Sequence, residues 1–144
     1  MNPSAPSSVA PFEEVVARLR EHGITPTQPR IEIGRVLFGG PQHVSADQVL
    51  ARLSTSRRGV SKATVFNTLG LFAEKGLLRE VVVDPSKLFY DTNVSPHHHV
   101  FHTDTGRLED VSLDQVHVTA LPSLPDGLRM EGVDVVIRVS RAEA

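Results

Sequence analysis

The chain has 144 residues, a hydrophobic fraction of 40% and a net charge of −2 at pH 7, which fits one or two small globular domains. It has no cysteine, and this excludes disulfides, thiolate zinc sites, iron–sulfur clusters and cysteine nucleophiles. No apolar run reaches the roughly 20 residues of a membrane span and no signal peptide is visible, so we expect a cytoplasmic protein without a membrane partner.

The charges are unevenly distributed along the chain. Residues 1–85 carry ten Lys/Arg and eight Asp/Glu, whereas residues 86–144 carry five and nine, together with five of the seven histidines. This pattern favours a DNA-binding region followed by a cation sensor. An ordinary solvated surface is the alternative interpretation.

Capping residues and apolar spacing predict four helices after a Pro/Ser-rich, disordered tail at residues 1–10. The third helix starts at a capping box, and in the fourth Val65, Leu69 and Phe72 form the buried stripe. Residues 54–59 between these two helices predict a polar turn. The predicted helices run from Phe12 to just before Gly23, from near Thr27 to Gly39, from Ser45 through Leu53, and from Ser61 to Gly76.

Two β-prone runs follow, at residues 78–83 and 87–90, with a turn at Asp84–Ser86. Helices followed by a β-hairpin predict a winged helix at residues 11–91. Residues 92–144 predict a second domain with turns at Gly106 and at residues 122–127, and a short helix within 113–121 is an alternative there. Its strands are expected around Val100, Leu108, Val111 and Val116–Val118, and over Val133–Val139.

We therefore expect an α+β fold, with an N-terminal winged-helix DNA-binding domain and a small C-terminal α/β dimerisation and sensing domain. The second domain is too small to bury a good core alone, so a homodimer is expected.

The stretch from Val60 to Leu69 is the candidate DNA-reading helix. Its first turn offers short polar groups and a cation, which contact phosphates and base edges, and its exposed Phe and Asn suit thymine methyls and adenine edges. An amphipathic helix with Phe66 in the core is the alternative interpretation. The candidate contacts to double-stranded DNA are Arg30, Ser61, Lys62, Thr64, Phe66 and Asn67.

The run Pro96-His-His-His-Val100 is the candidate metal site. In an extended strand His97 and His99 project to one face, about 7 Å apart, and His98 projects to the other. Asp91 and Asp110 are the nearest carboxylates that could complete the shell. Imidazole with carboxylate favours Fe(II), Mn(II) or Zn(II). A surface histidine run is the alternative.

The middle histidine predicts a second site. On the opposite face His98 would join His117 or His102, and imidazole is also a ligand of haem iron. The candidate residues for haem or a second ion are His97, His98, His99 and His117.

Five motifs occur in order along the chain: Ile24-Thr-Pro-Thr-Gln-Pro-Arg30, His43-Val-Ser-Ala-Asp47, Ala63-Thr-Val-Phe-Asn-Thr-Leu69, Lys75-Gly-Leu77 and the histidine run. In this order and spacing they resemble the ferric uptake regulator (Fur) superfamily over about residues 12–140. Several shorter runs look most like its iron response regulator (Irr) branch: Val81–Asp84, Ser86–Lys87, Asp91–Asn93, His97–His99 and Val133–Arg138.

The resemblance implies a repressor of iron homeostasis that binds AT-rich palindromic operators as a homodimer. In the superfamily a regulatory cation bridges the two domains, and the matching positions here are His43, Asp91, His97, His99 and Asp110. His43 enters through the resemblance alone, since by itself it looks like a loop histidine. Fe(II) or Mn(II) is the expected cation, and Zn(II) could bind in vitro. In the Irr branch the triple histidine is associated with haem and with release from DNA.

The chain departs from the superfamily pattern in three places. The Cys-x-x-Cys pairs of structural zinc are absent, with His102 and Thr105 at the first pair's positions, so no four-cysteine zinc is expected. Phe66 stands where Tyr is usual, and there is no Cys-Pro haem motif.

Two alternatives to an Irr-like regulator remain. A PerR-like peroxide sensor is favoured by Asp110, because Asp at the fifth ligand position accompanies iron-driven histidine oxidation there. A non-haem iron enzyme with a two-His-one-carboxylate triad is the remote alternative, and we expect the protein not to be an enzyme.

Overall fold

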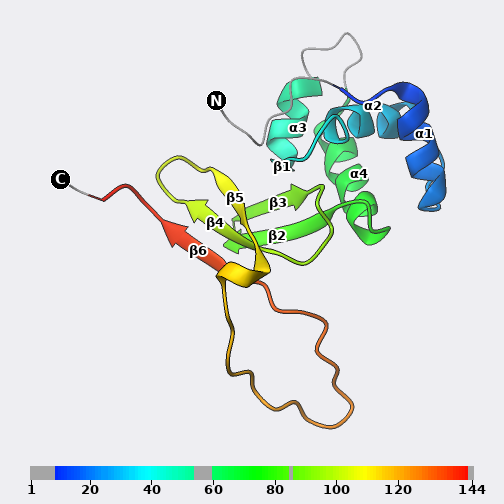
Figure 1. Cartoon of the computed structure of the whole chain (residues 1–144). Coiled ribbons are helices and arrows are strands. Elements are labelled where there is room, and N and C mark those ends of the chain that lie inside the picture. The colour runs from blue at the N-terminus through cyan, green and yellow to red at the C-terminus, as the bar shows by residue number, and fades with distance from the viewer. Residues whose placement is uncertain (1–8, 54–59, 85, 143–144) are drawn as a thin grey trace. The chain divides into compact units, whose positions relative to one another are not determined.

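A computed structural model describes residues 9–53, 60–84 and 86–142 (Figure 1). It separates into two compact units, Met1–Val94 and Ser95–Ala144. The predicted polar turn at 54–59 and most of the predicted N-terminal tail lie outside the described residues. Across the described ranges, no helix is both long and apolar enough to cross a membrane.

Within its described residues, the first unit contains the four predicted helices and the predicted β-hairpin, together with one further short strand. Thr27 precedes the second helix, and Ser45 and Gln48 exchange the two hydrogen bonds of a capping box. Ser61 Oγ accepts a hydrogen bond from the Thr64 backbone N–H at 3.2 Å. The elements are α1 (Phe12–Glu21), α2 (Gln28–Leu37), β1 (His43–Val44), α3 (Ala46–Leu53), α4 (Lys62–Glu74), β2 (Arg79–Asp84) and β3 (Lys87–Asp91).

The core of this unit lies among the four helices. The predicted stripe of Val65, Leu69 and Phe72 on α4 is fully buried, and the Phe72 ring stacks on Phe38 with a centroid distance of 6.1 Å. α4 packs against both α2 and α3. The orientation of α4 is therefore fixed by the helices that precede it.

The strands of the first unit form one sheet in the order β1-β3-β2. β2 and β3 form the predicted hairpin, and β1 adds to the outer side of β3 with His43 opposite Asp91 and Val44 opposite Tyr90. The sequence did not predict β1, because a strand of two residues is too short to show alternation.

The second unit is built on a three-stranded sheet in the order β5-β4-β6. β4 pairs antiparallel with β5 and parallel with β6. Phe101 and Leu108 are its buried hydrophobic residues among those described. The elements are β4 (His98–His102), β5 (Leu108–Val111), the 3-10 helix η1 (Leu113–Gln115) and β6 (Val136–Val139).

Two predictions about the second unit were wrong. No strand forms around Val116–Val118, and the last strand begins at Val136 rather than Val133. The physical reason is that most apolar side chains of residues 116–135 are exposed, so little burial favours a strand there. Val118 is 43% exposed and Leu128 is 63% exposed.

Candidate functional site

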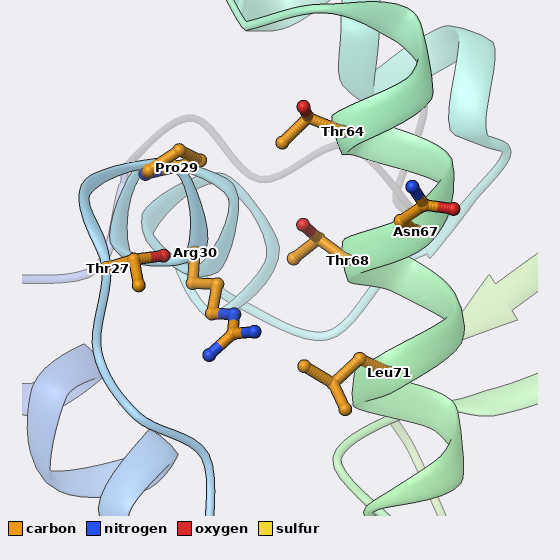
Figure 2. A pocket seen from close by; sticks show the side chains of 7 residues that line it. All are labelled: Thr27, Pro29, Arg30, Thr64, Asn67, Thr68 and Leu71. Carbon is orange, nitrogen blue, oxygen red and sulfur yellow. The ribbon is translucent and has the colours of Figure 1, made fainter.

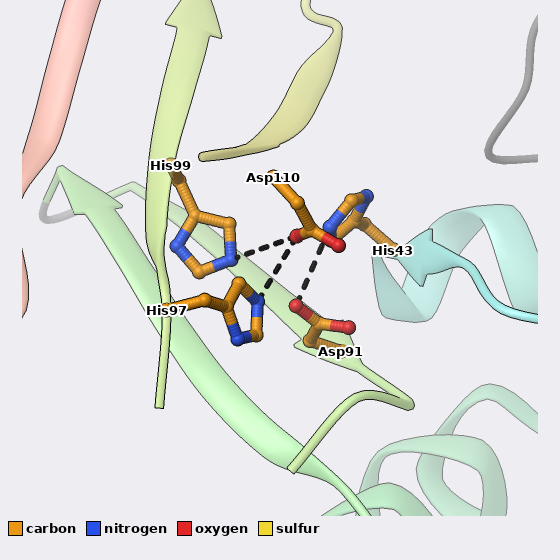
Figure 3. Close-up of side chains that lie close together, drawn as sticks. All are labelled: His43, Asp91, His97, His99 and Asp110. Carbon is orange, nitrogen blue, oxygen red and sulfur yellow. Dashed lines mark ion pairs between the residues drawn. The ribbon is translucent and has the colours of Figure 1, made fainter. Parts of the chain in front are cut away.

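The first pair of candidate ligands lies in the first unit. The β1–β3 pairing places His43 opposite Asp91, and the His43 Nε2 atom lies 3.3 Å from Asp91 Oδ2 (Figure 3). Asp91 is only 1% exposed, and its Oδ1 accepts a hydrogen bond from the Asn93 backbone N–H at 2.9 Å. One carboxylate oxygen is thus held by the backbone while the other faces an imidazole. The strand pairing therefore sets the geometry of a two-donor metal site.

The residue before Asp91 adds no competing charge. Burial raises the pKa of the Tyr90 phenol, and the Glu80 carboxylate opposite it on β2 raises this pKa further. Tyr90 therefore stays neutral at physiological pH and adds no negative charge beside Asp91.

The second set of candidate ligands lies in the second unit. The β4–β5 register places His99 opposite Asp110. Asp110 Oδ1 lies 3.0 Å from His97 Nε2 and 3.5 Å from His99 Nε2 (Figure 3). The two imidazole rings lie 4.5 Å apart, centre to centre. One carboxylate oxygen thus faces two ring nitrogens, as a shared metal site requires.

The chemistry of this second set fits a cation. His97 Nδ1 lies 2.6 Å from the Ser95 carbonyl oxygen, which can only accept a hydrogen bond, so Nδ1 carries the proton. A neutral His97 ring then directs the Nε2 lone pair at the Asp110 carboxylate. Two lone pairs face each other favourably only around a cation or a proton. The same carbonyl-to-imidazole contact commonly orients metal-binding histidines.

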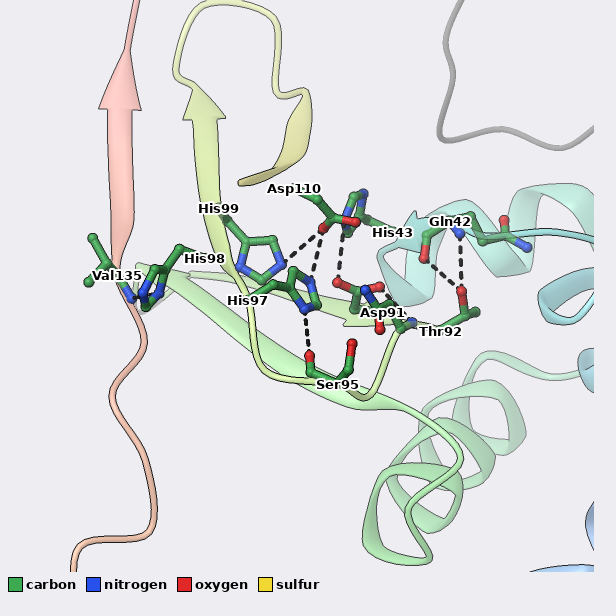
Figure 4. Close-up of polar contacts among 11 residues, drawn as sticks. Gln42, His43, Asp91, Thr92, Ser95, His97, His98, His99, Asp110 and Val135 are labelled. Atoms are coloured by element: carbon green, nitrogen blue, oxygen red, sulfur yellow. Dashed lines mark hydrogen bonds and ion pairs between the residues drawn. The ribbon is translucent and has the colours of Figure 1, made fainter. Parts of the chain in front are cut away.

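The middle histidine points elsewhere, as the strand alternation predicted. His98 is 5% exposed, and its Nδ1 accepts a hydrogen bond from the Val135 backbone N–H at 3.1 Å (Figure 4). His117 is exposed, and His102 Nε2 lies 3.1 Å from Glu109 Oε1. In the part of the chain that the structure describes, His98 does not join His117 or His102 in a metal-binding group.

The candidate DNA-reading residues lie along α4. Ser61, Lys62 and Asn67 are exposed, and Thr64 is half-buried. Phe66 is 43% exposed, so the alternative that places it in the core is wrong. The Lys62 ammonium lies 5.7 Å from the centre of the Phe66 ring. This exposed face of α4 presents a cation, an aromatic ring and an amide.

A pocket of about 260 Å³ separates the start of α2 from α4 (Figure 2). It brings together Arg30, Thr64 and Asn67, which the sequence analysis had selected separately. The Arg30 Nη1 donates a hydrogen bond to the Thr25 carbonyl oxygen at 2.8 Å, which holds the guanidinium at this surface. The pocket is lined by Thr27, Pro29, Arg30, Thr64, Asn67, Thr68 and Leu71.

Sequence reasoning missed Thr27 and Thr68 as part of this surface. Thr68 and Leu71 follow Thr64 by four and seven residues, so helical spacing alone puts all three on one face of α4. Thr27 is the residue that precedes α2, and its hydroxyl lies beside the helix N-terminus that favours phosphate oxygens. The helical spacing of Thr68 from Thr64 and the position of Thr27 directly before a predicted helix could both have been recognised in the sequence.

Comparison with known proteins agrees with this architecture. The Ferric uptake regulator family matches residues 21–135. The peroxide-responsive repressor PerR of Staphylococcus aureus (strain Mu50 / ATCC 700699) is 31% identical over 106 residues, which cover 74% of this chain and 72% of that relative.

Solved structures share the fold at lower sequence identity. The ferric uptake regulator of Pseudomonas aeruginosa with manganese has a TM-score of 0.66 and 22% identity, and covers 90% of this chain and 98% of its own. The ferric uptake regulator of Francisella tularensis with iron has a TM-score of 0.66 and 20% identity, and covers 83% and 92%. The chain therefore belongs to the ferric uptake regulator family of metal-responsive transcriptional regulators.

Proposed function

We propose that this protein is an Irr-like repressor of iron homeostasis, whose operator affinity is set by one Fe(II) or Mn(II) ion. His43, Asp91, His97, His99 and Asp110 would hold that ion. The observation that carries the proposal is that each unit contributes an incomplete ligand set, a His–Asp pair in the first and a His–His–Asp set in the second. Only five residues separate Asp91 from His97, so the chain limits their separation to about 20 Å.

The donor set selects the metal. Three imidazoles with two carboxylates suit Fe(II), Mn(II) or Zn(II) and disfavour Cu(I), which prefers sulfur. Two solved relatives with this fold contain manganese and iron, and another is described as a zinc-bound manganese uptake regulator. We propose Fe(II) or Mn(II) as the ligand in the cell, with Zn(II) able to replace either in vitro.

For DNA recognition, α4 would enter the major groove of the operator. Phe66 would contact thymine methyls and Asn67 an adenine edge, while Arg30, Ser61, Lys62 and Thr64 would hold phosphates. The exposure of most of these side chains and the pocket beside Arg30 support this arrangement. A palindromic operator then requires two copies of α4.

The second unit would supply the dimer contact. Its apolar residues are largely exposed in the single chain, and residues 116–135 contain no strand to bury them. A second copy is the simplest partner that would cover this surface. The exposed apolar residues of this unit include Leu113, Val118, Leu121, Leu124, Leu128, Met130, Val133 and Ile137.

Haem would act through a different arrangement. Iron needs a lone pair on an imidazole nitrogen, and His98 already uses its Nδ1 lone pair for the Val135 N–H. If iron takes Nε2, the proton of the neutral ring moves to Nδ1 and faces the Val135 N–H. We propose that haem binding at His98 releases Val135, with exposed His117 as a second candidate ligand.

Peroxide sensing is the second candidate function. Two observations favour it, namely the 31% identity to a peroxide-responsive repressor and the presence of Asp rather than Glu at position 110. In such a sensor, bound iron would direct peroxide to oxidise a ligating histidine. A mass increase of one oxygen on a histidine peptide after peroxide treatment of the Fe(II) protein, and none with Mn(II), would favour this function.

One experiment separates these functions. Fe(II), Mn(II) and haem are titrated separately into metal-free protein while fluorescence anisotropy follows its affinity for an AT-rich palindromic DNA. An Irr-like regulator responds to metal and to haem in opposite directions. A peroxide sensor responds to metal, loses DNA after peroxide only when iron is bound, and ignores haem. Operator affinity that no ligand changes would refute both.

A further inference from the structure

Gln42, the residue before His43, is buried, and both the nitrogen and the oxygen of its side-chain amide form hydrogen bonds. It is 3% exposed. Its Nε2 donates hydrogen bonds to the carbonyl oxygens of Val36 at 2.8 Å and Leu37 at 2.6 Å. Its Oε1 accepts a hydrogen bond from Arg52 Nη1 at 2.5 Å. One side chain thus connects the last turn of α2 to α3.

The chemistry of this position requires an amide. The last carbonyls of a helix have no partner within that helix, so both Nε2 hydrogens of Gln42 satisfy carbonyl acceptors at the C-terminal end of α2. The same group must also offer an oxygen to the Arg52 guanidinium. A carboxylate would turn its oxygens toward two carbonyl oxygens, and an apolar side chain would leave buried polar groups without partners.

The backbone of Gln42 is hydrogen-bonded to Thr92, the residue that follows the proposed ligand Asp91 at the end of β3. The Gln42 N–H donates to the Thr92 hydroxyl at 3.1 Å (Figure 4). The Thr92 N–H donates to the Gln42 carbonyl oxygen at 3.2 Å. Gln42 and Thr92 therefore join the two chain segments directly beside the His43–Asp91 pair, at the end of the β1–β3 ladder. The main chain of Gln42 is therefore hydrogen-bonded next to the proposed ligand pair His43 and Asp91, while its side chain is hydrogen-bonded to α2 and α3.

We propose that Gln42 is the positioning residue that couples metal binding at His43 and Asp91 to the orientation of the DNA-reading helix. This proposal rests on the proposed function. A cation that fixes His43 against Asp91 also fixes the adjoining Gln42–Thr92 step. The Gln42 amide passes this constraint to α2 and α3, against which α4 packs. Gln42 itself binds neither metal nor DNA.

The test compares operator affinity with and without Mn(II) in three full-length proteins: wild type, Gln42→Met and Gln48→Met. Gln48 is the matched control, since it loses the same amide in the same unit but, among the described residues, its side chain is hydrogen-bonded to Ser45 within the local capping box. In wild type we expect Mn(II) to change operator affinity by about 5- to 150-fold. In Gln42→Met this ratio should fall by about 2- to 30-fold, and in Gln48→Met it should stay at the wild-type value.

The ratio separates positioning from general damage. A substitution that only destabilises the fold lowers the folded fraction, which Mn(II) binding partly restores, so the ratio would stay the same or rise rather than fall. Mn(II) affinity, measured by calorimetry without DNA, should stay within about threefold of wild type in Gln42→Met, because all five proposed ligands remain. Hydrogen exchange gives an independent readout. Mn(II) should slow amide exchange in α3 and the last turn of α2 in wild type, but only in β1 and β3 in Gln42→Met.

A second variant covers the case in which Gln42→Met does not fold. Thr92→Val keeps the size of the side chain and the Gln42 amide but removes the hydroxyl that accepts from the Gln42 N–H, and it should also lower the ratio. If the folded variant of either residue keeps the wild-type ratio while wild type responds to Mn(II), the assignment of Gln42 is overturned and the proposed function stands. If wild type shows no response to Mn(II), the proposed function fails and the role of Gln42 fails with it.

Discussion

The backbone N–H of Val135 donates a hydrogen bond to Nδ1 of His98 across 37 residues of sequence. This bond lies at the point where the chain enters β6, whose first residue, Val136, is paired with His99. Because a backbone N–H can only donate, Nδ1 of His98 carries no proton and the neutral ring has its proton on Nε2. The middle histidine of the triplet is thus a structural acceptor.

His98→Ala should destabilise the protein, because it leaves the Val135 N–H without its acceptor. We expect a loss of about 1–3 kcal/mol in the free energy of unfolding, measured by urea denaturation of metal-free protein. His98→Asn is the control, since its side-chain oxygen can take the place of Nδ1 as acceptor. It should recover most of the loss, and equal destabilisation by both variants would show that this hydrogen bond contributes little.

Substitutions on α4 should separate sequence reading from phosphate binding. Asn67→Ala should lower the preference for operator over scrambled DNA by about 1–3 kcal/mol, since it removes a contact to a base edge. Lys62→Ala should weaken binding to both DNAs alike and reduce the slope of log affinity against log salt by about one. Anisotropy titrations at several salt concentrations measure both effects. An unchanged preference in Asn67→Ala would contradict the assignment of this face.

Removal of metal should leave the fold intact. The chain has no cysteine, and His102 Nε2 lies 3.1 Å from Glu109 Oε1. EDTA-treated protein should therefore keep its far-ultraviolet circular dichroism and remain dimeric in sedimentation. One chelator-resistant zinc per chain in elemental analysis would contradict this prediction.

The boundary between the units determines which truncation tests dimerisation. A chain ending near Pro85 would lose β3, which pairs with both β1 and β2, so the test requires a chain ending at Val94. That chain should sediment as a monomer and bind operator at least about 100-fold more weakly than the full chain, because two half-sites are no longer linked. A dimeric 1–94 chain would place the dimer contact in the first unit instead.

How far the sequence predicts the structure depends on whether the signal is local. Ser45 and Gln48 form their capping box because both partners lie within one helical turn, and the start of α4 at Ser61 is set in the same way. The alternation of His97, His98 and His99 is also local, and the structure confirms it.

The local patterns of the sequence could not predict contacts between residues that lie far apart along the chain. The position of His43 opposite Asp91 depends on a two-residue strand, and only the family resemblance indicated it. The role of Gln42 depends on contacts with Val36, Arg52 and Thr92, which no periodicity links. In the second unit, the expected strand at Val116–Val118 failed because alternation predicts a strand only when a neighbouring strand is available to pair with it.

The proposed clamp and the proposed haem site should be separable by mutation. His43→Ala removes one ligand from the first unit, so a cation held by the remaining residues no longer fixes the separation of the two α4 helices in a dimer. We expect it to abolish the Mn(II)-dependent change in operator affinity, a coupling of about 1–3 kcal/mol, and to leave haem binding unchanged. Haem is too bulky for that compact ligand set and takes only one or two axial imidazoles.

His98→Asn should show the opposite pattern, because it keeps the acceptor for Val135 but has no imidazole to bind iron. Its Mn(II) response should equal that of wild type, and haem should no longer change its operator affinity. Anisotropy titrations of both variants with Mn(II) and with haem, alongside the haem absorption spectrum, measure all four responses. If His43→Ala responds to Mn(II) as wild type does, metal does not act through a link between the two ligand sets. If His98→Asn keeps the full haem response, exposed His117 becomes the ligand to test next, with a His117→Ala variant that leaves the β4–β6 pairing intact.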